Sequence, residues 1–181
     1  MAGRLGGRRL RAPGGQGTRP TADRVRESLF SILGAVDGER VLDLFAGTGA
    51  LGIEALSRGA LSVTFVESAR PALAVLRENL RDLALESPQA IVLATPVERS
   101  MRRDRLGEHA FELVLADPPY ATLEVAVHAL EKLAADELVA ASARAALEHD
   151  ARDEPTCEGW SLVDRRSYGT AAVSFFDRAS R

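Results

Sequence analysis

The four residues D-P-P-Y, at positions 117–120, directly follow an apolar run at 111–116. The two prolines stiffen the turn and hold the residue before each of them in an extended conformation. The Asp117 carboxylate and the Pro118 carbonyl can each accept one N–H, and Tyr120 offers a flat face for a ring. An exocyclic amine on a nucleic-acid base has two such N–H groups. The stretch therefore predicts a site that turns the lone pair of an amine toward an electrophile.

A glycine-rich turn is the second feature that could do chemistry. Gly47, Gly49 and Gly52 form G-x-G-x-x-G after another apolar run, and Glu67 lies 20 residues past Gly47. The glycines permit a tight turn and let a ligand approach the backbone, and an acid placed like Glu67 accepts hydrogen bonds from ribose hydroxyls. Two ligand classes fit this pattern: a nicotinamide or flavin dinucleotide, and S-adenosylmethionine.

Asp43 helps to decide between these ligands. It stands four residues before Gly47, inside the apolar run, where dinucleotide folds usually keep apolar residues. A carboxylate there suits the ammonium of a methionine group, and it can also cap the glycine turn; the two uses are compatible. S-adenosylmethionine is therefore the expected cofactor. We expect no metal ion, because positioning and electrostatics would supply most of the rate.

The elements that must position these residues alternate along the chain. Apolar runs predict strands at 40–46, 61–67, 90–95 and 111–117, and helical patterns lie between and after them, at 50–59, 68–85, from Pro96 onward and at 123–135. The alanine-rich stretch 143–148 favours a helix by propensity, but the alternation predicts a fifth strand there, which we expect. Two alternating runs around Tyr168-Gly169 predict a closing antiparallel hairpin.

This alternation predicts an α/β protein with a mostly parallel sheet and helices on both faces. In such sheets, ligands bind beyond the carboxyl ends of the strands, where the strand order switches. The fourth strand is expected beside the first. Residues 117–120 should therefore face the glycine turn.

Composition sets the remaining limits. The chain has 181 residues, 46% of them hydrophobic and 27% charged, which suits one soluble domain. The longest apolar runs are too short to cross a bilayer, and no apolar segment typical of a secretory signal follows the basic N-terminus. Cys157 is the only cysteine, so a disulfide within the chain and a zinc-type cysteine cluster are excluded. A reducing cytoplasm is the expected location.

Charge is distributed unevenly along the chain. Residues 1–26 contain seven arginines and one acid, a net charge of +6, whereas the other 155 residues carry −9. We expect a basic N-terminal arm at 1–20, with a short strand near Arg8–Arg11, and a single domain at 21–181. That domain should open with a helix that Thr21 caps, that buries a stripe of Val25, Leu29, Ile32 and Leu33, and that ends at Asp37-Gly38. Two interpretations of the arm remain open: it binds a polyanionic partner, or it is a soluble tail that binds no partner.

Several of these segments together resemble one family. The stretches 17–30 and 42–60, the sequence FVES and the sequence LVLADPPY are similar to the RsmD family of bacterial 16S ribosomal RNA guanine-N2 methyltransferases. The resemblance covers roughly residues 5–135 clearly. It implies a Rossmann-like class I methyltransferase fold with seven strands and S-adenosylmethionine as cofactor. It also implies a guanine N2 target in the small ribosomal subunit or an assembly intermediate, and we expect a monomer that acts without a membrane.

The resemblance, together with the patterns above, assigns residues to three roles. The target amine is expected at Asp117, Pro118 and Tyr120. The cofactor is expected at Asp43, Phe45, Gly47, Thr48, Gly49, Glu67, Ser68, Pro96 and Val97. The RNA is expected at Arg8, Arg9, Arg11, Arg19, Thr21 and Arg24, with Arg26 in the same bordering segment. Asn79 is expected to hold the neighbouring loop.

Other functions remain open from the residues alone. A DNA or other RNA methyltransferase could use the same motif on adenine N6 or cytosine N4. A nicotinamide oxidoreductase could use the glycine turn, but it leaves residues 117–120 unexplained. A non-catalytic RNA-binding module would not need Gly47, Glu67 and Asp117 intact. The loop 95–97 has no side chain suited to adenine, so backbone groups would have to read it.

Overall fold

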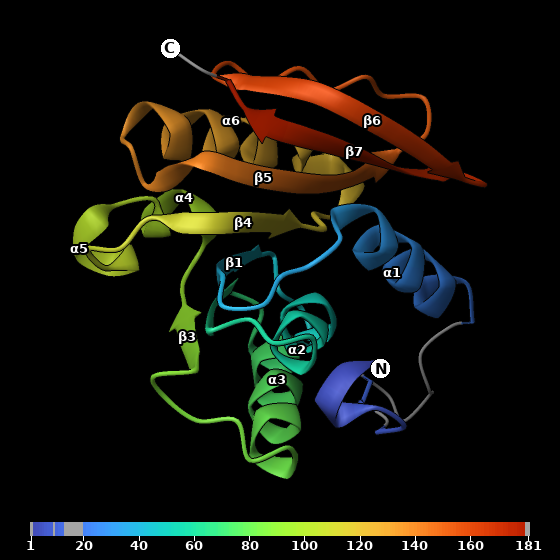
Figure 1. The fold of residues 1–181 in the computed structure, drawn as a ribbon, viewed down its shortest axis with the longest axis vertical. Helices are drawn as coiled ribbons and strands as arrows, with labels where there is room; N and C mark the ends of the chain where they lie inside the picture. Colours follow the sequence, from blue (N-terminus) through green and yellow to red (C-terminus); the bar gives the residue numbers. More distant parts are fainter. Residues whose placement is uncertain (1, 9, 13–19, 180–181) are drawn as a thin grey trace.

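A seven-stranded sheet forms the centre of the molecule (Figure 1). The computed structural model describes residues 2–8, 10–12 and 20–179, with residues 20–23 described by their backbone alone. The strand order is β3-β2-β1-β4-β5-β7-β6. The strands are β1 (Arg40–Leu44), β2 (Ser62–Glu67), β3 (Ala90–Ala94), β4 (Phe111–Ala116), β5 (Val139–Asp150), β6 (Trp160–Tyr168) and β7 (Ala171–Arg178). The first five pair in parallel and β7 pairs antiparallel with β5 and β6, so the predicted sheet is confirmed.

Helices cover both faces of this sheet (Figure 1). They are α1 (Pro20–Leu33), α2 (Ala50–Ser57), α3 (Arg70–Asp82), α4 (Val97–Ser100), α5 (Arg103–Leu106) and α6 (Leu123–Ala135), with 3-10 turns η1 (Gly3–Leu5) and η3 (Tyr120–Thr122). Apolar residues of α1, α2 and α3 pack on one face, and those of α4, α5 and α6 pack on the other. The central strands β1 and β4 are rich in apolar residues because both of their faces are buried, and Asp43 of β1 is a buried exception. In the described residues, we find no helix with the length and apolarity needed to cross a bilayer.

The fifth strand is confirmed, and it is longer than expected. Helix propensity does not decide this alanine-rich stretch, because β5 lies between β4 and β7 and buries Ala143, Ala145 and Ala146. Ala145 and Leu147 pack on the α6 side of the sheet, and Ala146 packs on the α1 side. Tertiary burial therefore overrides the local preference.

The first helix differs from the expectation at both ends. It begins at Pro20, so Thr21 lies in its first turn rather than at a capping position, and it ends at Leu33 rather than at 37–38. Gly34 follows with a φ of 73°, and its N–H bonds to the carbonyl of Phe30, a left-handed ending that suits glycine. Ile32 was also wrongly placed in the core: it is 36% exposed, whereas Phe30 is buried.

The predicted strand near Arg8–Arg11 is wrong for the part of this segment that the structure describes. Residues 3–5 form η1 instead, and residues 8 and 10–12 join no sheet. The physical reason lies on α3: the Asn79 side chain takes the place of a neighbouring strand. Its Oδ1 accepts the N–H of Arg11 at 2.8 Å, and its Nδ2 donates to the Arg11 carbonyl at 3.2 Å.

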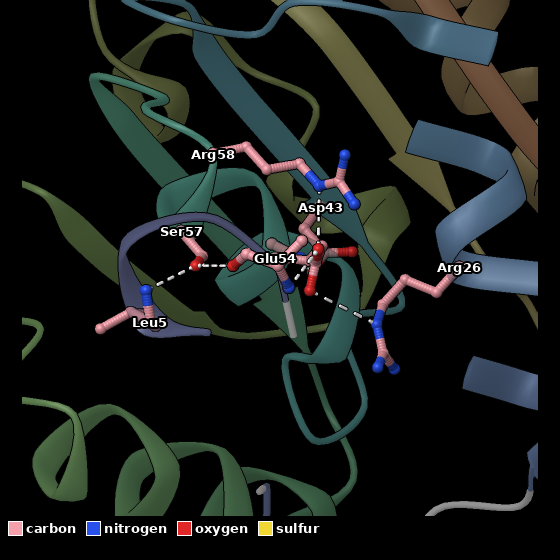
Figure 2. Close-up of polar contacts among 8 residues, drawn as sticks. Leu5, Arg26, Asp43, Glu54, Ser57 and Arg58 are labelled. Atoms are coloured by element: carbon pink, nitrogen blue, oxygen red, sulfur yellow. Dashed lines mark hydrogen bonds and ion pairs between the residues drawn. The ribbon is translucent and has the colours of Figure 1, made fainter. Parts of the chain in front are cut away.

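The beginning of the chain is held against α2 by polar contacts (Figure 2). The buried carboxylate of Glu54 accepts the N–H of Ala2 at 3.1 Å and pairs with Arg58 at 2.8 Å. One turn further along, the Ser57 hydroxyl accepts the N–H of Leu5 at 2.9 Å and donates to the carbonyl of Ala2. The arm therefore starts on the helix that follows the glycine turn.

Candidate active site

A cavity of about 630 Å³ opens beyond the carboxyl ends of β1, β2 and β4. The strand order switches here, because β1 has β2 on one side and β4 on the other, where open α/β sheets bind ligands. Asp117 and Pro118 line this cavity, so the structure brings D-P-P-Y to the glycine turn as expected. Eight of the nine residues assigned to the cofactor also line it: Asp43, Phe45, Gly47, Thr48, Glu67, Ser68, Pro96 and Val97.

Gly49, the ninth, shapes the turn without lining the cavity. Its φ is 84°, and a Cβ built on it would lie 2.4 Å from Leu76 Cδ1. A Cβ on Gly52 would lie 2.4 Å from Phe65 Cε1 and 2.8 Å from Asp43 Oδ2. Gly49 therefore lets α3 pack closely beneath the turn, and Gly52 lets α2 pack closely on β1 and β2.

Glu67, at the end of β2, is already engaged with the backbone around the turn. One oxygen accepts the N–H of Gly47 at 2.8 Å, and the other accepts the N–H groups of Ser68 and Ala69, each at 2.7 Å. A carboxylate has about four lone-pair sites, so these bonds leave room for roughly one more donor. Glu67 thus holds the two loops that border the cavity, and it keeps limited capacity for a ribose hydroxyl.

Asp43 is almost fully buried under the turn. Its Oδ2 accepts the N–H of Gly52 at 2.9 Å, which is the capping role expected as one of its two uses. Burial raises the pKa of Asp43 to about 7; the Gly52 bond opposes this, and the charges of Asp117 and Glu67 add to it. The charges of Asp117 and Glu67 therefore both act on Asp43 around a single cavity, a charge pattern that favours a cationic ligand.

The D-P-P-Y turn presents acceptors that the chain does not use. The Pro119 carbonyl accepts both the N–H and the hydroxyl of Thr122, each at 2.8 Å, but no donor reaches the Pro118 carbonyl within the described ranges. Solvent reaches the Asp117 carboxyl, while the surrounding chain partly desolvates it and raises its pKa. Tyr120 is not among the cavity-lining residues; it follows in η3 with 52% of its surface exposed.

The residues assigned to RNA fall into different environments. Arg8 and Arg24 are exposed. Arg11 is also exposed, but its guanidinium pairs with two acids of α3, Asp82 at 2.7 Å and Glu78 at 3.8 Å. A phosphate would therefore have to compete with these carboxylates for Arg11.

Two assigned residues, Arg9 and Arg19, lie outside the described residues, and the same is true of the Thr21 side chain. Arg26, assigned to the segment that borders the site, is buried and does not face solvent. It is 8% exposed and points at Glu54, with 3.7 Å between its Nε and Glu54 Oε2 (Figure 2). It helps to hold α1 on α2.

Asn79 links the arm to the glycine turn. Besides its two bonds to Arg11, its Nδ2 donates to the carbonyl of Thr48 at 3.0 Å, and the residue is 2% exposed. The expectation that Asn79 holds the neighbouring loop is confirmed. Its simultaneous contact with the arm was not expected, because only the fold brings residues 11, 48 and 79 together.

Sequence reasoning missed Glu148, a half-buried acid on β5. Burial and the charge of Asp117 raise the pKa of Glu148 to about 7. One signal was available: an acid occurs near the end of the predicted fifth strand, which was expected beside the fourth. No motif marks it, however, and its neighbour is known only from the strand register.

The sheet order, the antiparallel C-terminal pair and the glycine turn at the switch point define a Rossmann-like class I S-adenosylmethionine-dependent methyltransferase fold. The structure of SMU.776 in complex with SAH has this fold over 88% of the chain, with a TM-score of 0.68. It covers 50% of that chain at 15% identity, so it shows the fold alone.

The family is shown by sequence. The family model described as Conserved hypothetical protein 95 matches residues 1–177, and the chain belongs to this family. It is 33% identical to the Ribosomal RNA small subunit methyltransferase D of Haemophilus influenzae, over 97% of this chain and 91% of that protein. It is also similar to the hypothetical protein TTHA0928 of Thermus thermophilus: 32% identity, TM-score 0.77, 96% of this chain and 95% of that one. Membership of the RsmD family is thereby confirmed.

Proposed function

We propose that this protein transfers a methyl group from S-adenosylmethionine to the exocyclic N2 of a guanine in 16S ribosomal RNA. The named relatives support a ribosomal RNA substrate. The choice of an amine rests on D-P-P-Y, and the choice of guanine rests on the family resemblance. The proposal includes a monomeric enzyme in the cytoplasm that uses no metal ion and acts on the small subunit or an assembly intermediate.

One observation supports the choice of cofactor: the carboxyl groups of Asp43 and Glu67 line one cavity, where the charge of Glu67 acts on the buried Asp43. The methionine end of S-adenosylmethionine carries an ammonium and a sulfonium, both positive, so this cavity fits it. A dinucleotide would instead bring the negative charge of a pyrophosphate toward Asp43. The residues present therefore favour S-adenosylmethionine over a nicotinamide cofactor.

The chain's own groups position the target amine. When bound, S-adenosylmethionine supplies an electrophilic methyl group on a positively charged sulfur. The amine lone pair is delocalised into the base, so the amine is a poor nucleophile until it is oriented. Asp117 and the Pro118 carbonyl each accept one N–H, which holds the amine in one orientation. The exposed ring of Tyr120 offers a stacking surface for the base.

The RNA is proposed to reach this site along the basic arm, residues 1–20, beside the domain at 21–181. Arg8 and Arg24 are exposed and available for phosphates. The arm begins on α2 through Ala2 and passes α3 at Arg11, so its described parts lie on the helices that flank the glycine turn. Phosphate contacts would orient the RNA, and D-P-P-Y would select the amine.

Methyl transfer to defined substrates tests the function. Small ribosomal subunits that lack the modification are incubated with the enzyme and labelled cofactor, and the labelled nucleoside is identified after digestion. The proposal expects N2-methylguanosine. N6-methyladenosine or N4-methylcytidine would overturn the guanine assignment and favour the alternative amino-methyltransferases. Naked 16S RNA and DNA in parallel reactions show which form of substrate is accepted.

A further inference from the structure

Glu148 lies beside the residue proposed to hold the target amine. Strands β4 and β5 are parallel neighbours, and Ala116 pairs with Leu147 in their register (Figure 1). Asp117 and Glu148 are the next residue on each chain. Adjacent strands are about 4.8 Å apart, so these two carboxyl groups extend from neighbouring positions at the same edge of the sheet.

Glu148 and Asp43 are on the same face of the sheet. Leu115 and Ala146 lie two residues before Asp117 and Glu148, and both pack in the apolar cluster formed with α1, α2 and α3. Because side chains alternate between faces along a strand, Glu148 is on that face. Asp117, directly after the end of β4, lies close enough for its charge to act on both Glu148 and Asp43. Asp43 is on this face as well, since it accepts the N–H of Gly52 on α2.

Glu148 has no polar partner within the described part of the chain. Its carboxyl group forms no hydrogen bond or ion pair there, although the residue is half-buried and adjacent to another acid. Burial and the charge of Asp117 raise the pKa of Glu148 to about 7. Ionising this carboxyl group therefore costs free energy in the protein without substrate. A donor that arrives with the substrate would favour its ionised form and remove this cost.

Guanine offers such a donor next to its amine. On the Watson–Crick edge of guanine, the ring N1–H is adjacent to the N2 amine, so two neighbouring acceptors can bind both groups. In adenine and cytosine, the ring nitrogen beside the amine on this edge is an acceptor, which an ionised carboxylate repels. An acceptor adjacent to Asp117 therefore separates guanine from the other two amine-bearing bases.

We propose that Glu148 selects guanine by accepting its N1–H while Asp117 accepts an N–H of its N2 amine. This inference rests on the proposed function, because it assumes that the target amine is held at Asp117. It assigns Glu148 to recognition of the base and not to the transfer of the methyl group. Without Glu148, Asp117 would hold any amine of suitable shape.

A base analogue tests this role directly. The substrates are small subunits reconstituted with 16S RNA that carries guanine or 2-aminopurine at the methylated position. 2-Aminopurine keeps the 2-amino group but has an acceptor at N1. At pH 8, where Glu148 is mostly ionised, the parent enzyme should prefer guanine by on the order of 10- to 100-fold in kcat/KM.

Glu148→Gln should shrink this preference at least about tenfold, because the amide N–H can donate to N1 of 2-aminopurine. Glu148→Ala should lose activity on guanine without gaining activity on 2-aminopurine. Glu86→Gln, in an exposed loop at the opposite end of the parallel strands, should keep the parental ratio. The Gln variant is isosteric and removes a charge, and cofactor binding checks that it is folded.

The outcomes separate the two proposals. An unchanged guanine preference in Glu148→Gln, with N2-methylguanosine still formed by the parent, overturns the role of Glu148 and leaves the proposed function intact. If the parent forms no N2-methylguanosine, the proposed function fails and the role of Glu148 fails with it. A smaller preference for guanine in Glu148→Gln, together with the parental preference in Glu86→Gln, supports both the role of Glu148 and the proposed function.

Discussion

The polar side chains on the two sides of β1 differ in how many hydrogen bonds they form within the chain. On the β2 side, Glu67 accepts three backbone N–H groups, and Asp43 of β1 itself accepts one from α2. Asn79 adds three bonds that join the glycine turn to the arm. On the β4 side, the side chains of Asp117 and Glu148 form no hydrogen bond with any described residue.

This difference separates residues that hold the site from residues that await a substrate. The β2 side is organised by the chain itself, so changes there should alter local structure together with cofactor affinity. The β4 side keeps free acceptors, so changes there should alter the reaction and leave the fold and cofactor binding intact. The following variants test this division, beginning with the largest expected effect.

Asp117→Ala should reduce methyl transfer on the order of 10²–10³-fold, the usual result of removing one preorganised contact in a transition state. The fold and cofactor affinity should stay close to those of the parent, because Asp117 has no hydrogen-bond partner among the described residues. Single-turnover transfer at saturating cofactor measures the effect. Asp117→Asn keeps an acceptor oxygen without the charge and should be less impaired. If Asp117→Ala transfers at the parental rate, the amine is not held at this motif.

Asp43→Asn should change how stability depends on pH. The folded pKa of about 7 lies above the usual 3.8, so Asp43 favours the folded state most below pH 4 and loses this contribution as pH rises to 7. The neutral amide cannot lose it, and its oxygen can still accept the Gly52 N–H. Relative to the parent, the variant should therefore gain roughly 2–4 kcal/mol between pH 4 and pH 8.

Urea unfolding at both pH values measures this gain. Glu148, whose pKa is also raised to about 7, should leave some pH dependence in the variant. Equal differences in unfolding free energy at pH 4 and pH 8 would mean that Asp43 titrates normally. The variant should also bind S-adenosylmethionine more weakly, because the ammonium loses a counter-charge. Stability and cofactor affinity would then move in opposite directions at pH 8.

Glu67→Ala should weaken S-adenosylmethionine binding by about 10- to 150-fold, because a charged hydrogen bond contributes about 1.5–3 kcal/mol. It should also loosen the turn, since Gly47, Ser68 and Ala69 lose their acceptor. Calorimetry and amide hydrogen exchange measure the two effects. Unchanged affinity would remove Glu67 from the ribose site, and unchanged exchange at Gly47 would show that the turn is held by other contacts.

The same division explains what could be predicted from the sequence. The glycine turn, Glu67 and D-P-P-Y were predictable because each follows a recognisable strand, and parallel strands bring their ends to one edge. Glu148 could not be predicted as a site residue, because its position beside Asp117 depends on the register of β4 and β5, which no local pattern encodes. The prediction of a strand in the arm was wrong because the Arg11 backbone forms hydrogen bonds with a side chain 68 residues away, that of Asn79. The burial of Arg26 was not predictable because Glu54, with which it pairs, lies on another helix.

The smallest expected effect concerns the arm, where each phosphate contact changes the salt dependence of RNA binding modestly. Replacing Arg8, Arg9 and Arg11 with alanine should flatten that dependence and leave cofactor affinity unchanged. Single variants are sharper: Arg8→Ala should lower the slope by up to about 0.7–0.9, whereas Arg11→Ala should lower it less, because Asp82 already neutralises Arg11. The backbone bonds between Arg11 and Asn79 survive both changes, so the turn should stay in place. RNA affinity measured over a series of salt concentrations tests whether the arm contacts phosphates. Equal slopes for the parent and all three variants would mean that the arm does not contact phosphates.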